Sequence, residues 1–106
     1  MYQKLTSTDT ATKLPIAQDA WLLHRLEKLE VIRLHLAPGA SMENHINEWR
    51  IIFFVIQGVG SLDVEGKVYE LGEEQSIAVE AGLERFWSNN RDQNLELLVI
   101  KSREQT

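Results

Sequence analysis

Three polar side chains at alternating positions are the first candidates for chemistry in this sequence: Glu43, His45 and Asn47. On a β-strand, residues at i, i+2 and i+4 point to the same side, so these three would share one face. Glu43, His45 and water can hold a divalent ion weakly, and a histidine with a reference pKa of about 6.5 can act as a general base. The structural alternative is a histidine that only hydrogen-bonds to Asn47 or to the backbone. His45 and Glu43 are therefore the candidate catalytic residues, and both alternatives stay open.

The composition argues against several other chemistries and partners. The 106 residues include no cysteine, which rules out disulfides, thiolate metal ligands and a cysteine nucleophile. The formal net charge is −5, with lysines and arginines scattered, which disfavours nucleic acid or an anionic membrane as partner. No apolar run approaches the ~20 residues of a membrane helix, and residues 1–13 lack the apolar stretch of a signal peptide. We expect a cytoplasmic protein with no nucleic-acid and no membrane partner.

The elements that must position these residues are predicted to be strands. Turn residues recur at short intervals after Pro38-Gly39, and many short strands at such spacing are typical of a sandwich or barrel. The stretch Trp21–Glu30 suits a helix or a strand, and we favour a strand. A lead-in segment over residues 1–20 and one barrel domain over residues 21–106 are expected. The other expected strands cover residues 31–36, 51–57, 61–64, 67–71, 76–79, 85–88 and 95–101.

The glycines around the histidine form a motif that resembles the first motif of the cupin superfamily, in particular of its small single-barrel members. Gly39 and Gly58 stand in register at the two ends of the motif, and His45 occupies its first histidine position. Asn47 replaces the second histidine of the family, and Ile51 replaces its glutamate.

A second stretch resembles the second cupin motif. Residues 69–82 follow the family's run from a leucine through a turn to a glycine, which is kept as Gly82. Arg85 stands at the last metal-ligand position, normally a histidine, and Asn89 matches the closing asparagine. The resemblance covers residues 31–102 and implies an all-β fold, an antiparallel jelly-roll barrel of the double-stranded β-helix type.

The resemblance also implies where a site would lie and what it would lack. The family's metal is held by three histidines and a carboxylate, and of these four positions only His45 is kept, so we expect no metal and no cofactor. Glu43 is expected to pair with Arg85 across the barrel. The interior wall is expected to bind a ligand through His45, Asn47, Ile51, Phe53, Arg85 and Trp87. In the alternative, Trp87 and Phe53 fill a barrel that has no cavity.

Three functions follow from these alternatives. The leading hypothesis is a metal-free cupin-like barrel that binds a small organic ligand in its interior, with a carboxylate or phosphate met by Arg85. The second is a small cupin enzyme of the isomerase, epimerase or lyase type that uses His45 and Glu43, with or without a weakly bound divalent metal. The third is a solid barrel with a structural role.

The strand over residues 51–57 also predicts a homodimer. Its residues are apolar without alternation, so the face that does not fill the barrel needs a cover. With Ile51 inward, Ile52, Phe54 and Ile56 project outward as an apolar patch. Either the segment around residues 21–26 folds over this patch or a second subunit covers it, and Phe86 is expected to join the contact. We expect a homodimer through this face.

Overall fold

The computed structural model describes residues 4–16 and 18–103, and the regular structure of these residues consists of strands. They are β1 (Thr12–Lys13), β2 (Asp19–Leu26), β3 (Leu29–Leu36), β4 (His45–Ile46), β5 (Arg50–Gln57), β6 (Gly60–Val64), β7 (Lys67–Leu71), β8 (Ser76–Val79), β9 (Glu84–Ser88) and β10 (Leu95–Ser102). The all-β prediction is confirmed. No helix long and apolar enough to cross a membrane occurs in the described residues.

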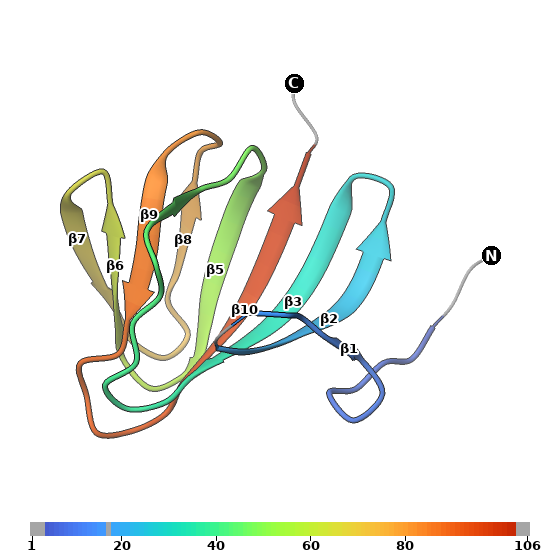
Figure 1. Cartoon of the computed structure of the whole chain (residues 1–106), viewed down its shortest axis with the longest axis horizontal. Helices are drawn as coiled ribbons and strands as arrows, with labels where there is room; N and C mark the ends of the chain where they lie inside the picture. Colours follow the sequence, from blue (N-terminus) through green and yellow to red (C-terminus); the bar gives the residue numbers. More distant parts are fainter. Residues whose placement is uncertain (1–3, 17, 104–106) are drawn as a thin grey trace.

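The strands form two antiparallel sheets. One has six strands in the order β1-β2-β3-β10-β5-β8, and the other has four in the order β4-β9-β6-β7. Figure 1 shows them fanned across the molecule, with β7 at one side and β2 at the other. Neighbours in each sheet come from distant parts of the chain, as where β10 pairs with both β3 and β5, and this is the jelly-roll arrangement expected.

The N-terminal part of the domain differs from expectation. The stretch from Trp21 to Glu30 is not one strand: β2 ends at Leu26, a turn follows at Glu27 and Lys28, and β3 begins at Leu29. The two strands pair as a hairpin. The turn has neither glycine nor proline, and its flanking leucines hide the break in the sequence pattern. Strand β2 also begins two residues before the expected start of the barrel at residue 21.

The core lies between the two sheets. Alternation along each strand places one set of side chains inward, as residues i and i+2 of a strand share a face. The inward residues of the three central strands of the larger sheet are buried: Ile32, Leu34 and Leu36; Ile51, Phe53 and Val55; Leu95, Leu97 and Val99. Opposite them, Leu62 of β6 and Trp87 of β9 close the core from the smaller sheet.

The outward face of β5 is apolar and partly open to solvent. Ile52 is 45% exposed, Ile56 is 37% exposed and Phe54 is half-buried. Strand β2 lies in the same sheet, beyond β3 and β10, so it does not fold over this face. Phe86 belongs to β9 in the other sheet, so its expected part in the same contact is wrong.

Candidate functional site

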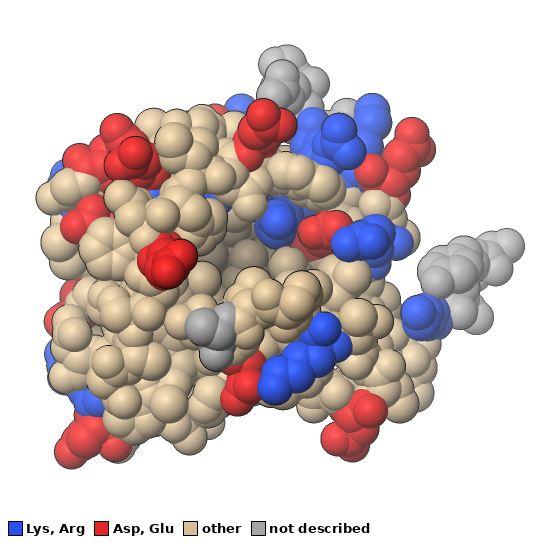
Figure 2. Space-filling view, in the orientation of Figure 1, with Lys and Arg blue, Asp and Glu red and all other residues tan. Residues whose placement is uncertain are grey.

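A cavity of about 690 Å³ opens between the two sheets. Figure 2 shows this face of the molecule hollowed in its middle, with a lysine or arginine at the edge of the hollow. Its inner wall is made of buried apolar residues, among them Ile32 of β3, Ile51 and Phe53 of β5, and Val99 of β10. The interior is therefore not filled by its own side chains, and the volume lies within the range of small-ligand sites.

Arg85, on β9, is a charged residue that lines the cavity. Its side chain is 1% exposed, and its Nη1 donates a hydrogen bond to the backbone carbonyl oxygen of Leu83 at 3.0 Å. Its Nε and Nη2 are buried without a hydrogen-bond partner, and no carboxylate of the described residues forms an ion pair with it. Burial lowers the pKa of Arg85, yet a guanidinium stays protonated at neutral pH. The cavity wall thus holds a positive charge without a counter-charge.

Trp87 lies two residues further along β9, on the same face. Its side chain is 1% exposed and packs edge-on against Phe53, with 5.4 Å between ring centroids and 78° between ring planes. The Cε3–Cζ3 edge of the indole lies over Gly60, where a Cβ would come within 3.0 Å of both atoms. The indole Nε1 is on the opposite edge and has no hydrogen-bond partner. Among the described residues that line the cavity, Trp87 therefore adds a second side chain with a buried, unpartnered donor.

The expected pair between Glu43 and Arg85 does not form. Glu43 is exposed at the cavity rim, and His45 beside it is exposed as well. Strand β4 covers only His45 and Ile46, so the alternation expected from residue 43 to residue 47 does not hold. His45 Nδ1 lies 3.2 Å from the backbone oxygen of Glu43, not from its carboxylate. The two candidate catalytic side chains are therefore not joined to each other or to Arg85.

Asn47 has a local role in the same rim. Its Oδ1 accepts a hydrogen bond from the backbone N–H of Trp49 at 2.9 Å, and its carbonyl oxygen accepts one from Gly82 at 2.9 Å. This ties the turn before β5 to the turn before β9. All six expected ligand-binding residues line the one cavity. Ile51, Phe53, Arg85 and Trp87 are buried in its wall, whereas His45 and Asn47 stand at the rim.

The residues at the four positions of a cupin metal site do not fit a metal ion. Ile51 offers no ligand atom, the side-chain oxygen of Asn47 is already used by Trp49, and Arg85 places a buried positive charge at the fourth position. His45 alone remains, and among residues 4–16 and 18–103 no group of three histidine, aspartate or glutamate side chains is arranged to hold an ion.

One wall of the cavity comes from the lead-in segment, which the sequence patterns did not connect to the site. Leu14, Pro15, Ile16 and Gln18 line the cavity. The backbone N–H of Leu14 donates to the carbonyl of Ala20 at 2.8 Å, and Gln18 Nε2 donates to the carbonyl of Ser41 at 3.3 Å. The apolar run Leu14-Pro-Ile16 in an otherwise polar segment was the available sequence signal.

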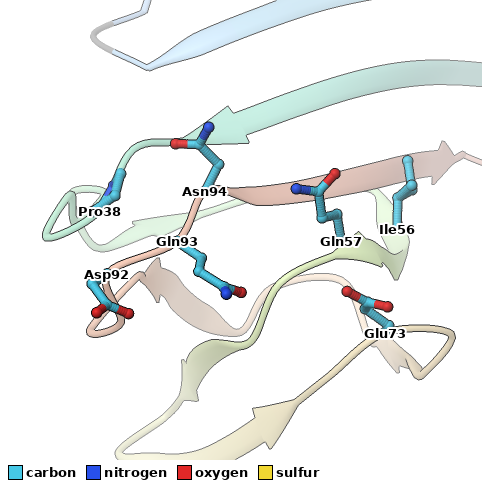
Figure 3. A pocket seen from close by; sticks show the side chains of 7 residues that line it. All are labelled: Pro38, Ile56, Gln57, Glu73, Asp92, Gln93 and Asn94. Atoms are coloured by element: carbon cyan, nitrogen blue, oxygen red, sulfur yellow. The ribbon is translucent and has the colours of Figure 1, made fainter.

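A second hollow lies at the other end of the molecule, where β3 and β5 end and β10 begins. Figure 3 shows its residues, with Glu73 and Asp92 on separate loops. Its volume is about 630 Å³, but every described residue that lines it is exposed, and none of these carries a basic side chain. The hollow is open to solvent and lacks the buried polar groups of the first cavity.

Two facing sheets around an internal cavity define the class, a small jelly-roll barrel. The family model of the cupin domain matches residues 32–101, and the chain belongs to the cupin family. No curated protein shows significant sequence similarity to it.

Solved structures support the same fold. An RmlC-like cupin from Shewanella frigidimarina is similar with a TM-score of 0.83 and 14% identity, over 98% of this chain and 94% of that one. The polyketide cyclase RemF from Streptomyces resistomycificus has a TM-score of 0.83 and 16% identity, over 97% and 81%. A predicted oxalate decarboxylase from Thermotoga maritima has a TM-score of 0.82 and 18% identity, over 93% and 98%. These likenesses concern the fold, which hosts unrelated functions.

Proposed function

We propose that this protein is a metal-free cupin that binds a small organic anion in the cavity between its sheets. The observation that carries the proposal is Arg85, a buried cation in the cavity wall with two unpartnered nitrogens. An isolated buried charge is costly, and native structures keep one mainly where a partner neutralises it. Because no carboxylate of the described residues does so, a ligand anion is the fitting partner.

The other two functions have less support. The enzyme hypothesis needs His45 and Glu43 to act together, but both side chains are exposed and only the backbone of Glu43 contacts the imidazole. The solid barrel is at odds with the cavity of about 690 Å³. The structural relatives include a polyketide cyclase and a predicted oxalate decarboxylase, and at their low identity neither activity is transferred to this chain.

The proposal is tested by ligand titration followed through the Trp87 indole N–H signal in NMR spectra, assigned with a Trp87→Phe variant. A panel of carboxylates, sulfonates and phosphate monoesters is added to untagged protein. We expect at least one class to shift this signal in the wild type and in Arg91→Gln, an exposed arginine paired with Glu70. Arg85→Gln is expected to lose the response. A panel without any response contradicts the proposal.

Elemental analysis of the same untagged protein tests the metal-free part of the proposal. We expect far less than one transition-metal ion per chain, because one histidine without further ligands binds such ions weakly. A stoichiometric metal that disappears in His45→Ala would overturn this part and revive the enzyme hypothesis.

We also propose that two copies of the chain associate through the outward face of β5. Phe54 is paired with Leu98 of β10, and Ile52 is paired with Ile100, so the apolar surface continues across two central strands of the six-stranded sheet. A two-fold contact lays such a patch on itself, and two-fold dimers are the commonest closed assembly. We also propose a cytoplasmic location, on the grounds of the amino-acid composition.

A further inference from the structure

The two unpartnered nitrogens of Arg85 lie on one edge of its guanidinium. Nη1 is held by the carbonyl of Leu83, which leaves the Nε–H and the neighbouring Nη2–H as a pair of parallel donors. This edge matches the two oxygens of a carboxylate in a bidentate hydrogen-bonded pair. From this geometry we infer that the ligand is a monocarboxylate with an apolar body. The inference rests on the proposed function and specifies its ligand class.

The number of buried, unpartnered hydrogen-bond donors indicates the head group of the ligand. Arg85 offers two and the Trp87 indole offers a third, all buried and without partners. An ionised carboxylate has two oxygens with about four lone-pair sites, which is enough for all three. A phosphate monoester would bring a third oxygen and a second negative charge into a wall that has no further free donor among its buried described side chains. The carboxylate therefore matches this donor set best.

The body of the ligand follows from the rest of the wall. Ile32, Ile51, Phe53 and Val99 are buried and present only hydrocarbon to the cavity. Hydroxyl groups placed against them would lose their hydrogen bonds to water without replacement, which disfavours sugar acids. An alkyl or aryl chain gains from the same surface, because apolar area leaves water on binding.

A second carboxylate has no favourable place. Lys101 also lines the cavity, but its Nζ is 3.7 Å from a carboxylate oxygen of Glu30 and stacks over Trp49 at 5.3 Å. Glu43 adds a negative charge at the rim. Among the described residues, a dianion would therefore meet Arg85 as the cation without an ion-pair partner, and the carboxylates of Glu30 and Glu43.

Binding requires a small rearrangement of the wall. The Arg85 and Trp87 nitrogens are covered in the structure, and rotamer changes of this kind are common when a ligand binds. The Trp87 indole signal therefore responds to binding of the head group.

The experiment compares probes that share one chain length: octanoate, octanamide, suberate and octyl phosphate. Phenylpropanoate is added as an aryl monocarboxylate. We expect octanoate or phenylpropanoate to shift the Trp87 indole signal and to bind at least about tenfold more tightly than octanamide, suberate and octyl phosphate, a factor of ten corresponding to about 1.4 kcal/mol. Arg85→Gln should weaken binding of the monocarboxylate at least as much, and Arg85→Lys should restore only part of it, because an ammonium lacks the planar fork.

The outcomes separate this inference from the proposed function. If octyl phosphate or suberate binds as tightly as the monocarboxylates and Arg85→Gln abolishes the response, anion binding stands and the monocarboxylate class is wrong. If octanamide binds equally well, the carboxylate head group is wrong. If neither monocarboxylate binds, the inference fails. If no sulfonate or phosphate of the wider panel binds either, the proposed function fails with it. The comparison of probes uses the wild-type protein and does not depend on how well any variant folds.

Discussion

Arg85 is the buried charged side chain among the described residues, and its burial carries an electrostatic cost. Removing a guanidinium from water without a counter-ion costs several kcal/mol in effective terms, on the order of the penalty for any buried ion. Its one hydrogen bond, to the carbonyl of Leu83, does not offset such a cost. Residues that serve binding are often retained at the expense of stability. A substitution at Arg85 measures this cost in stability directly.

The substitution Arg85→Met should therefore stabilise the free protein while abolishing anion binding. Methionine has similar length, and even the replacement of a buried ion pair by apolar groups of similar volume is often neutral or stabilising by about 1–4 kcal/mol. Urea denaturation measures the change, with Arg91→Met, at an exposed arginine, as the matched control. A loss of more than about 1 kcal/mol, the size of one net hydrogen bond, would show that Arg85 is structural.

Gly60 sets the position of Trp87. A Cβ at this position would lie 2.4 Å from Leu95 Cδ2 and 3.0 Å from two atoms of the indole ring. Gly60→Ala should lower the free energy of unfolding by about 1–3 kcal/mol, as expected for overpacking, and should shift the Trp87 indole signal. Gly72→Ala is the control, because the nearest atoms there are 3.7 Å from a Cβ. Equal stability of the two variants would contradict the packing described.

Turns and side-chain hydrogen bonds at the ends of the strands hold the strands in register. In the turn between β6 and β7, Glu65 and Gly66 have φ of 50° and 87°, and Asp63 accepts a hydrogen bond from the Gly66 N–H at 2.9 Å. At the end of β9, the buried side chain of Asn89 donates to the carbonyls of Leu36 and Gln93 at 3.0 and 2.7 Å. Asn89 thus joins the ends of β9 and β3 to the loop before β10.

Asn89→Ala should consequently destabilise the domain without altering the head-group site. The buried carbonyl of Leu36 loses its side-chain partner, and an unsatisfied buried group costs about 1–3 kcal/mol. Thermal or urea unfolding measures the loss, and Asn90→Ala, at an exposed position, should change little. A destabilisation of the same size in both variants would argue against the role of Asn89.

At the scale of the whole molecule, the remaining feature is the apolar outer face around Phe54. Ile52 and Ile56 on the same strand are exposed. At the border of this face, Arg33 and Glu96 form an ion pair, with 3.2 Å between Arg33 Nη2 and Glu96 Oε1. A face with an apolar centre and a paired polar border is the usual anatomy of a protein interface.

The homodimer prediction is checked by light scattering at tens of micromolar protein. We expect twice the chain mass of 12.2 kDa for the wild type. Phe54→Glu should give monomer or aggregate, since it places a charge in the centre of the contact. Val68→Glu is the control, because Val68 is 61% exposed on β7 in the other sheet. A monomeric wild type would show that the face serves no self-association.

The sequence by itself determined the strands, their inward and outward faces, and the cupin fold. The strands depend on alternation and turn chemistry, which act between residues close in the chain, and the cupin fold was implied by the resemblance of two motifs to that family. Ile51 and Phe53 were placed inward because Ile51 stands at a ligand position of the first motif, and the turn at Glu65-Gly66 falls between the expected strands 61–64 and 67–71. The turn at Glu27 and Lys28 was missed because no glycine or proline marks it.

Only the tertiary structure decided whether Arg85 has a carboxylate partner. Whether Glu43 and Arg85 form an ion pair depends on the path of the segment that carries Glu43. Strand β4 is too short to include Glu43, so the alternation of a strand does not set the direction of this side chain. The contribution of residues 14–16 and of Gln18 to the cavity likewise depends on the path of the chain before β2. Some side chains are close in space but distant in sequence, or are separated by irregular backbone. Contacts between such side chains do not follow the two-residue period of a strand. Their contacts are therefore set by the packing of the whole domain.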